Sequence, residues 1–389
     1  MADRIASIQC YVVDLKQESP YLGSLRDGEE VDDQGYFVRK QNGTVYPRHN
    51  RSLVVEIKTQ AGVEGWGETY GIVAPRATAE IIKDLLTGFV LGCDPFEMQT
   101  VHDRLYDLMR VRGYHGGFYL DALAAIDIAL WDIAGKIAGL PVHQLLGGKY
   151  REKIHGYVSG LPCDTLRERC DFALNWQERG FDAFKFAAPV ADEGVVSEFR
   201  ELRRALGDEA KIACDLHWTQ TKASAVELAR RISVHHPWFI EAPMPSEDVT
   251  GLQYVAHHSG QTIAVGEEWR TVFDARSRID CGAVHIIQPE MGHTGITQFM
   301  RIGRYAEAHH LQVMPHATIG SGIFLAASLQ ASAALRNVVS HEFQHSLLQP
   351  FRHFTGNVLS CEAGFYRIPN SPGIGVEPSE AMKKKMTRI

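Results

Sequence analysis

Seven charged or imidazole residues recur along the middle of the chain, each near the end of a short apolar run. They are Lys185, Asp215, Glu241, Glu267, Glu290, His316 and Glu342, and subtracting neighbouring positions gives gaps of 30, 26, 26, 23, 26 and 26 residues. Carboxylates can hold a divalent cation, an imidazole can move a proton near neutral pH, and a lysine can offset negative charge. Such groups at a near-constant repeat indicate one chemical site assembled from successive structural units.

The repeat itself predicts the elements that carry these residues. Each apolar run has the length and composition of a buried parallel strand, and the segments between them, such as 221–233 and 296–308, have the periodicity of amphipathic helices. Strands that alternate with helices form βαβ units, and this many units favour a closed (β/α) barrel over an open sheet. Because the active site of such a barrel lies where its strands end, the recurring residues are expected to ring one mouth.

Three of these residues are carboxylates that end successive strands, Asp215, Glu241 and Glu267. An all-oxygen ligand set suits Mg²⁺, and three neighbouring carboxylates would repel one another without a cation. The sequence therefore predicts one Mg²⁺ ion held by these three side chains. Glu268 is expected to point to the other face of its strand and to be the weaker candidate ligand.

Composition and charge exclude several classes of protein. The chain has 389 residues and a net charge of -7, so a basic nucleic-acid-binding face is not expected. Its seven cysteines contain no CxxC pair, which indicates reduced thiols and a cytoplasmic location. We find no signal-peptide pattern and no apolar run near the roughly 20 residues that a membrane span needs. A small molecule is the expected partner, with neither nucleic acid nor membrane.

The N-terminal part has a different pattern. A long polar segment at 17–50 follows the first strand and is interpreted as a lid over the barrel mouth, in which Arg48 and His49 could touch a substrate. A hairpin is predicted next, and then helices at about 75–91, 95–112 and 118–138. The last helix is apolar nearly all round and is expected to be buried between layers.

Asp127 and Asp132 lie within that last helix. Five residues apart, they occupy different helix faces, which favours structural or capping roles for them. Two more expectations concern the barrel: Trp269 should form a wall of the pocket, and His341 should face away from the site because side chains alternate along a strand.

The spaced carboxylates, the buried segment at 121–148 and the late His316 together resemble the enolase superfamily, mandelate racemase subgroup, over nearly the whole chain. The resemblance implies an α/β fold, a modified TIM (β/α)7β barrel at 146–350 with an α+β capping domain at 1–145 and a C-terminal segment at 351–389 that returns to the cap. It also implies Mg²⁺ on Asp215, Glu241 and Glu267, removal of the proton α to a carboxylate, and a homo-oligomer.

The chain departs from this subgroup at the second barrel strand, where the family carries Lys-x-Lys. Lys185 matches the first lysine, which touches the substrate carboxylate, but Ala187 stands where the second lysine acts as a base. Ala187 cannot move a proton, so a two-base racemase is disfavoured. On the other side, His316 and Glu290 match the family's His–Asp dyad with Glu in place of Asp, and Glu342 matches the acidic residue that contacts the substrate carboxylate.

His217 follows Asp215 by two residues, so the two side chains are expected to share one strand face. Acid-sugar dehydratases of the subgroup often carry this Asp-x-His, where the histidine helps the β-hydroxyl to leave. The expected function is a Mg²⁺-dependent dehydratase of a sugar acid, in which His316 takes the α-proton and His217 protonates the leaving group. The roles of His217 and His316 could be exchanged, depending on substrate stereochemistry.

Three alternatives accompany this interpretation. A zinc amidohydrolase would need His-x-His on its first strand, and none of the 18 histidines has another two residues away. An isomerase or cycloisomerase of the same superfamily could use His316 alone. A barrel that only binds sugar acids is disfavoured, because the three carboxylates and the dyad are intact. Within the subgroup the chain looks most like dehydratases of hexaric acids such as galactarate, with uronic or aldonic acids also possible.

Overall fold

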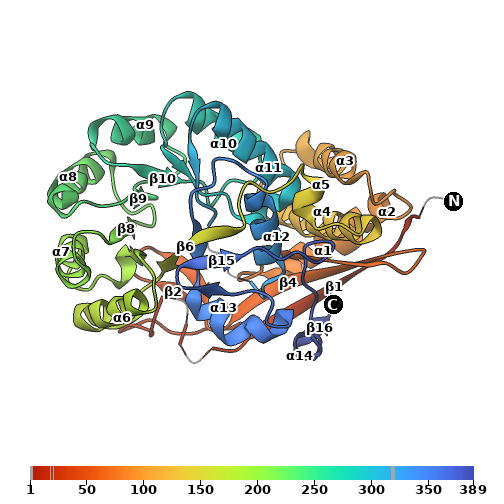
Figure 1. Ribbon diagram of the computed structural model, residues 1–389, viewed down its shortest axis with the longest axis horizontal. Helices are drawn as coiled ribbons and strands as arrows, with labels where there is room; N and C mark the ends of the chain where they lie inside the picture. Colours follow the sequence, from red (N-terminus) through yellow and green to blue (C-terminus); the bar gives the residue numbers. More distant parts are fainter. Residues whose placement is uncertain (1–2, 18, 21, 317–319) are drawn as a thin grey trace.

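The computed structural model describes residues 3–17, 19–20, 22–316 and 320–389. A cap and a barrel lie side by side (Figure 1). The cap sheet is antiparallel, in the order β16-β1-β4-β5, and it joins the two ends of the chain. Its strands are β1 (Ile5–Leu15), β4 (Asn50–Thr59), β5 (Glu64–Thr69) and β16 (Met386–Arg388).

Helices cover one face of this sheet. A helical stretch is formed by α1 (Pro75–Glu80), the π-helix η1 (Ile81–Leu86) and α2 (Thr87–Val90), followed by α3 (Met98–Arg110), α4 (Gly117–Ala138) and the short α5 (Val142–Leu145). From Tyr119 to Gly135, α4 is buried on all sides because the helix lies between β5 and the barrel helix α11. The helix predicted at 118–138 is thus confirmed as an interlayer element.

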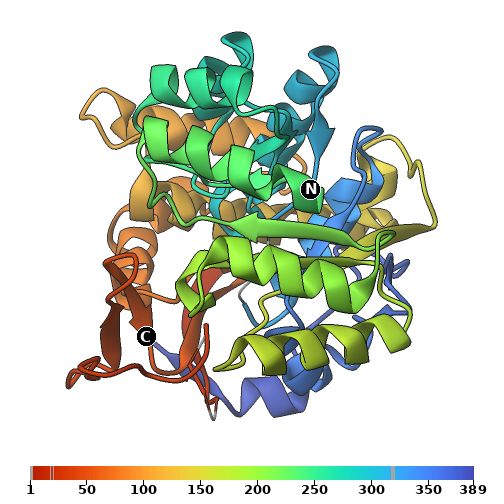
Figure 2. The ribbon, with the colours of Figure 1, turned by 90° about the vertical axis from the view of Figure 1, so that its left-hand side faces the viewer.

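Eight parallel strands form the barrel. They are β6 (Lys153–Ser159), β7 (Ala183–Ala187), β8 (Lys211–Asp215), β9 (Ile240–Glu241), β10 (Ile263–Val265), β11 (Ile286–Ile287), β12 (Gln312–Val313) and β13 (His341–Phe343). The α-helices that connect them are α6 (Leu166–Glu178), α7 (Val195–Leu206), α8 (Lys222–Ile232), α9 (Val249–His258), α10 (Val272–Asp280), α11 (Met291–Ala308) and α12 (Ile323–Ala333). Figure 2 shows the helices that follow β6 to β9 as an outer layer over the strands.

The sheet closes on itself. Strands β6 to β12 pair in sequence order, β13 pairs in parallel with β6, and the amide of Val339 donates to the carbonyl of Val313 at 3.1 Å to join the last gap. The helix directly after β13 is short: α13 (His345–Phe351), which contains Pro350. The predicted α/β fold, a (β/α)7β barrel with an α+β cap, is confirmed.

The tail returns across both parts. Strands β14 (Cys361–Glu362) and β15 (Phe365–Arg367) form a hairpin against β6, and the chain then passes through α14 (Glu380–Lys383) to β16 beside β1. Within the described residues, no helix combines the length and the apolar character needed to cross a bilayer.

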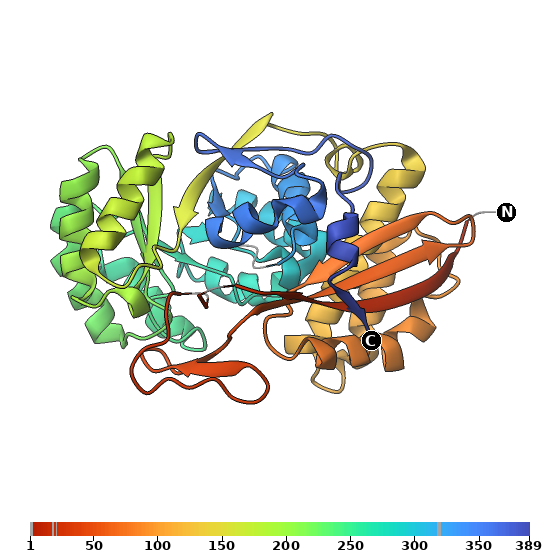
Figure 3. The same ribbon diagram turned by 90° about the horizontal axis from the view of Figure 1, so that it is seen from below.

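The segment at 17–50 holds structure that the sequence did not predict. Its residues form an antiparallel hairpin of β2 (Tyr36–Arg39) and β3 (Thr44–Pro47). Figure 3 shows this hairpin extending away from the cap sheet alongside the barrel. Its strands are short, and Arg39 and Pro47 occupy two of the buried positions, so no apolar alternation marks them.

A layer of apolar side chains fills the barrel interior and fixes where the polar groups stand. It consists of Tyr157, Ala183, Ala213, Phe239, Ala264, Ile286 and Met314. Since side chains alternate along a strand, the residue two positions later points inward one layer higher. On six of the strands that residue is polar: Ser159, Lys185, Asp215, Glu241, Gln288 and His316.

Candidate active site

Lys185 lies at the centre of the polar layer. Its Nζ is 2.9 and 2.7 Å from the two carboxylate oxygens of Glu241 and 2.8 Å from Oε1 of Glu342. Burial alone would lower the pKa of Lys185, but the charges of these two carboxylates raise it well above its ordinary value. The lysine is therefore a fixed positive charge inside the barrel mouth.

Asp215 and His217 form a pair at the end of the third strand. Nε2 of His217 is 2.8 Å from Oδ2 of Asp215, and the backbone amide of His217 donates to Oδ1 at 2.8 Å. Burial opposes protonation of His217, yet the charge of Asp215 raises its pKa. The two side chains are neighbours as expected, but strand alternation is the wrong reason. Strand β8 ends at Asp215, and His217 reaches back with a left-handed φ of 48°.

His316 follows β12, the seventh barrel strand, which lies across the barrel from β8. Its Nδ1 is 2.9 Å from Oε2 of Glu290, and its Nε2 is 2.9 Å from Oε2 of Glu267. Burial opposes its protonation, but the charges of Glu267 and Glu342 raise the pKa of His316 well above the usual range. The structure thus brings His316 and Glu290 together and leaves Nε2 directed at the carboxylates.

These carboxylates exceed the cations available to balance them. Burial, and then the charges of Asp215, Glu342 and Glu267 working against Lys185, raise the pKa of Glu241 to about 8. A divalent cation would relieve this excess of negative charge. Oxygen donors of this kind fit Mg²⁺.

The geometry of the possible ligands differs in one respect from the predicted set. Glu241, Glu267 and His316 offer ligand atoms that all lie within 4.8 Å of one another. Asp215 is not part of that group because its carboxylate is turned toward His217. Asp215 and Glu241 are nevertheless register partners on adjacent strands. Glu241 thus belongs to the cluster and also neighbours Asp215, and the ligand set of Asp215, Glu241 and Glu267 stays a prediction.

A cavity of about 330 Å³ opens above these residues. Among its lining residues are Tyr46, Asp215, His217, Glu267, Arg270, His293 and His316. The hairpin tip covers it: Nδ2 of Asn42 is 3.3 Å and the hydroxyl of Tyr46 is 3.5 Å from Nδ1 of His217. Part of the segment interpreted as a lid therefore lies directly over the site.

Sequence reasoning missed three contacts of the site. The amide of Gln288 donates to Oε2 of Glu241 at 2.8 Å, and Asn42 and Tyr46 reach His217 from the cap. Gln288 could have been found from strand alternation, because it follows the inward-pointing Ile286 by two residues. No local signal marks Asn42 or Tyr46, since their role depends on where the hairpin packs.

Other residues lie outside the chemistry. Trp269, expected as a pocket wall, is buried in the core at 1% exposure, and Trp218 lines the cavity instead. His341 faces Ser328 at 2.8 Å, as expected for a structural role. Glu268 is half-buried and lies outside the ligand cluster, and desolvation raises its pKa to about 7.

Arg48 and His49 both contact Gln17, at the start of the segment interpreted as a lid. Nη1 of Arg48 donates to the Gln17 carbonyl at 3.1 Å, and Nδ1 of His49 accepts from the Gln17 amide at 3.3 Å. Neither residue is among those that line the cavity above the carboxylates. The described contacts therefore give both a role in holding the segment.

Asp127 and Asp132 have the structural roles predicted for them. Asp127 accepts hydrogen bonds from the amide and the hydroxyl of Thr297, at 2.9 and 2.5 Å. Asp132 accepts from the amides of Trp66 and Ile374, each at 2.9 Å. Both carboxylates thus fasten α4 to its neighbours.

Comparison with known proteins agrees with this architecture. The family model described as "Enolase C-terminal domain-like" matches residues 168–382. The model described as "Mandelate racemase / muconate lactonizing enzyme, N-terminal domain" matches residues 41–147. The chain is also 32% identical over 362 residues to a D-galactonate dehydratase from Ralstonia pickettii, covering 87% of this chain and 92% of the relative.

Solved structures of two bacterial proteins are similar to this chain over nearly its whole length. A protein from Sinorhizobium meliloti, described as an isomerase, is 57% identical with a TM-score of 0.98, over 99% of this chain and all of that one. A member of the enolase superfamily from Agrobacterium tumefaciens is 53% identical with a TM-score of 0.97 over the full length of both. The chain belongs to the enolase superfamily, mandelate racemase subgroup, and is an enzyme of its acid-sugar dehydratase and isomerase family.

Proposed function

We propose that the protein is a Mg²⁺-dependent dehydratase of a sugar acid. The observation that carries the proposal is the pair of imidazoles that line one cavity from opposite sides of the barrel: His217 follows the third strand and His316 follows the seventh. A dehydration needs one group to take a proton and another to give one to the leaving hydroxyl. Ala187 supplies no second lysine base, which disfavours a two-base racemase.

The proposed steps use groups already in place. In its neutral form, His316 accepts the proton α to the carboxylate at Nε2, while Glu290 holds Nδ1 and orients the ring. Lys185 offsets the negative charge that develops on the carboxylate. His217 then protonates the β-hydroxyl, which leaves as water, and the enol product tautomerises to a 2-keto-3-deoxy acid. Glu342, fixed by Lys185 at 2.8 Å, borders the position of the substrate carboxylate.

Enzymes of this superfamily use Mg²⁺. Asp215, Glu241 and Glu267 would hold the ion here, and when bound it supplies a divalent positive charge beside the substrate carboxylate. Gln288 and Lys185 position Glu241 for that role through hydrogen bonds of 2.7 to 2.9 Å.

The substrate is a sugar acid whose configuration is left to experiment. The hexaric preference derived from the sequence stays a prediction, while the name of the R. pickettii relative supports an aldonic acid. The description of the S. meliloti protein favours a second candidate function, an isomerase or cycloisomerase that uses His316 alone.

An end-point screen tests the proposal. Purified protein with Mg²⁺ would be incubated with aldonic, uronic and hexaric acids, and semicarbazide would detect 2-keto products. We expect product from one or a few acids, lost with EDTA and in His316→Asn. His310→Asn is the matched control, because His310 is exposed and its left-handed φ of 59° suits Asn. Its activity should equal that of the unaltered enzyme.

Exchange in heavy water separates the alternatives and the roles of the two histidines. For a dehydratase with His316 as base, His217→Asn should still exchange the α-proton while releasing little product, whereas His316→Asn should do neither. Exchange by the unaltered enzyme without any keto product would indicate the isomerase. The reverse pattern in the two variants would exchange the roles of His217 and His316.

A further inference from the structure

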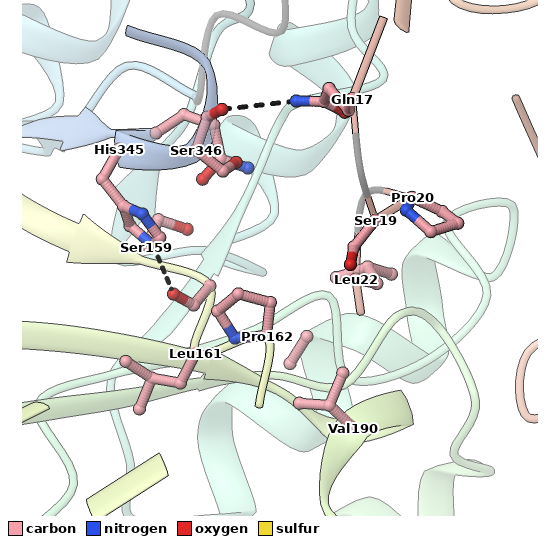
Figure 4. A pocket seen from close by; sticks show the side chains of 13 residues that line it. Gln17, Ser19, Pro20, Leu22, Ser159, Leu161, Pro162, Val190, His345 and Ser346 are labelled. Atoms are coloured by element: carbon pink, nitrogen blue, oxygen red, sulfur yellow. Dashed lines mark hydrogen bonds between the residues drawn. The ribbon is translucent and has the colours of Figure 1, made fainter. Parts of the chain in front are cut away.

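A second, smaller chamber of about 160 Å³ adjoins the Lys185 cluster. Its wall combines the ends of β6, β7 and β13 with the start of the segment at 17–50 (Figure 4). The lining residues used below are Gln17, Ser159, Gly160, Ala187, Gln344 and His345. None of the chemical steps proposed above involves this chamber.

The chamber begins where the catalytic cluster ends. Ser159 is the register partner of Lys185, and Ala187 follows Lys185 by two residues on the same strand face. Gln344 follows Glu342 by two residues. A substrate whose carboxylate lies at Lys185 can therefore extend into this space, which the small side chain of Ala187 leaves open.

The side-chain amide of Gln344 is buried in this chamber and has no hydrogen-bond partner among the described residues. Its side chain is 2% exposed, and within the described residues neither Oε1 nor Nε2 has a hydrogen-bond partner. A Cβ placed on Gly160 would lie 3.7 Å from Oε1, which locates the amide oxygen beside that backbone. Buried amides are normally paired, so a bound group is expected to complete this one. An amide both donates and accepts, as a hydroxyl does.

The described lining residues of the chamber offer no cation for a second carboxylate. Among its described lining residues the only titratable side chain is His345, whose ring nitrogen Nε2 is 2.8 Å from the carbonyl of Gly160. Burial lowers the pKa of His345 to about 4, so it is neutral at pH 7. In the larger cavity, Arg270 is already paired with Asp121 at 3.0 Å. A second substrate carboxylate in the smaller chamber would therefore lose its hydration without gaining a cation as partner.

We propose that this chamber is a subsite for the uncharged, hydroxyl-bearing end of the sugar acid, held by the side-chain amide of Gln344. The inference rests on the proposed function and narrows it: the substrate is a monoacid with a polyol end, as in an aldonic acid, rather than a hexaric diacid. Gln344 thereby determines specificity at the end of the substrate that does not react.

Binding is measured separately from turnover to test this. In a His316→Asn background with Mg²⁺, isothermal titration compares each aldonic acid with the hexaric acid of the same configuration. We expect at least one aldonic acid to bind about tenfold or more tightly than its diacid. Gln344→Leu, which removes both hydrogen-bonding groups at similar volume, should weaken that aldonic acid about three- to tenfold. Gln344→Lys should shift the preference at least tenfold toward the diacid.

Gln349→Lys is the matched control. Gln349 is exposed on α13, so the substitution makes the same charge change outside the chamber. It should leave the preference unaltered. Three results would overturn the subsite. They are equal or tighter binding of the diacid by the His316→Asn protein, no binding of any aldonic acid by it, and an unchanged affinity when Gln344→Leu is added. Selective binding by the parent protein without keto product from the active enzyme would instead refute the dehydratase and leave the subsite standing.

Discussion

Glu290 connects the His316 ring to the start of α11 through its two carboxylate oxygens. Oε2 is 2.9 Å from Nδ1 of His316, and Oε1 accepts the amide of Gly292 at 3.0 Å at the start of α11. Glu290→Gln keeps the shape but loses the charge that makes the ring basic, so we expect kcat to fall about 10- to 100-fold with little change in KM. Steady-state kinetics on the substrate found in the screen would measure it.

Glu290→Asp tests the length of the same side chain. Aspartate is one methylene shorter than glutamate and cannot keep both contacts, so we expect kcat to fall about tenfold. The exposed Glu209 provides the control variant, Glu209→Gln, which should leave kcat unaltered. Full activity of both Glu290 variants would contradict the orienting role.

Residue spacing predicted much of the site, since strand ends in a barrel converge whatever the loops do. Lys185, Glu241 and His316 could be placed at the mouth from the repeat alone. Gln344 and Asn42 could not be identified. Gln344 is singled out because its buried amide has no hydrogen-bond partner among the described residues, and Asn42 because of a contact with a residue 175 positions away. Such properties arise only when the whole chain has folded.

The hairpin of β2 and β3 is the element that links the cap to the chemistry. Asn42, in the turn between its strands, lies 3.3 Å from Nδ1 of His217. We expect Asn42→Ala to lower kcat about three- to tenfold, because His217 loses a hydrogen bond that orients its ring. The exposed Asn370 provides the control variant, Asn370→Ala. Rates that are equal in the two variants would show that the hairpin does not orient His217.

The sequence concealed this hairpin for a physical reason. Its two strands have only four residues each, and Arg39 and Pro47 stand at two of the four buried positions, so no apolar alternation marks it. The barrel strands, by contrast, are buried on both faces and form apolar runs in the sequence. Periodicity therefore predicted the barrel strands and missed the short hairpin.

His345 begins α13 and ties this helix to the loop after β6 through the Gly160 carbonyl. Burial lowers the pKa of His345 to about 4, below the value of about 6.5 in an unfolded chain. The unfolded state therefore binds more protons between these pH values, and stability falls as pH decreases from 6.5 toward 4. The loss should reach about 2 kcal/mol at pH 5.

Urea unfolding at pH 7 and at pH 5 measures this dependence. In His345→Gln the titrating group is absent, so the difference between the two pH values should shrink by about 2 kcal/mol. His353→Gln, a change of the same kind on the exposed surface, should retain the full difference. An undiminished pH dependence in His345→Gln would assign the acid sensitivity to other groups.

At the scale of the molecule, the cap and the barrel share one core. Apolar residues of β1, β4 and α4 belong to the same buried cluster as those of α6, α11 and α12. The repeat of strands and helices predicted the barrel, yet not how the cap is fastened to it. That depends on pairs far apart in the chain, such as Asp127 with Thr297, 170 residues later.

Asp127 provides the test of whether cap and barrel unfold together. Asp127→Ala leaves the amide and hydroxyl of Thr297 without their acceptor at a buried interface, and we expect a loss of about 2 to 4 kcal/mol. Calorimetry should show one transition, shifted as a whole, because the shared core couples the two parts. The exposed Asp107→Ala should change stability by less than about 0.5 kcal/mol. Two separate transitions in the unaltered protein would show that the cap is an independent unit that merely rests on the barrel.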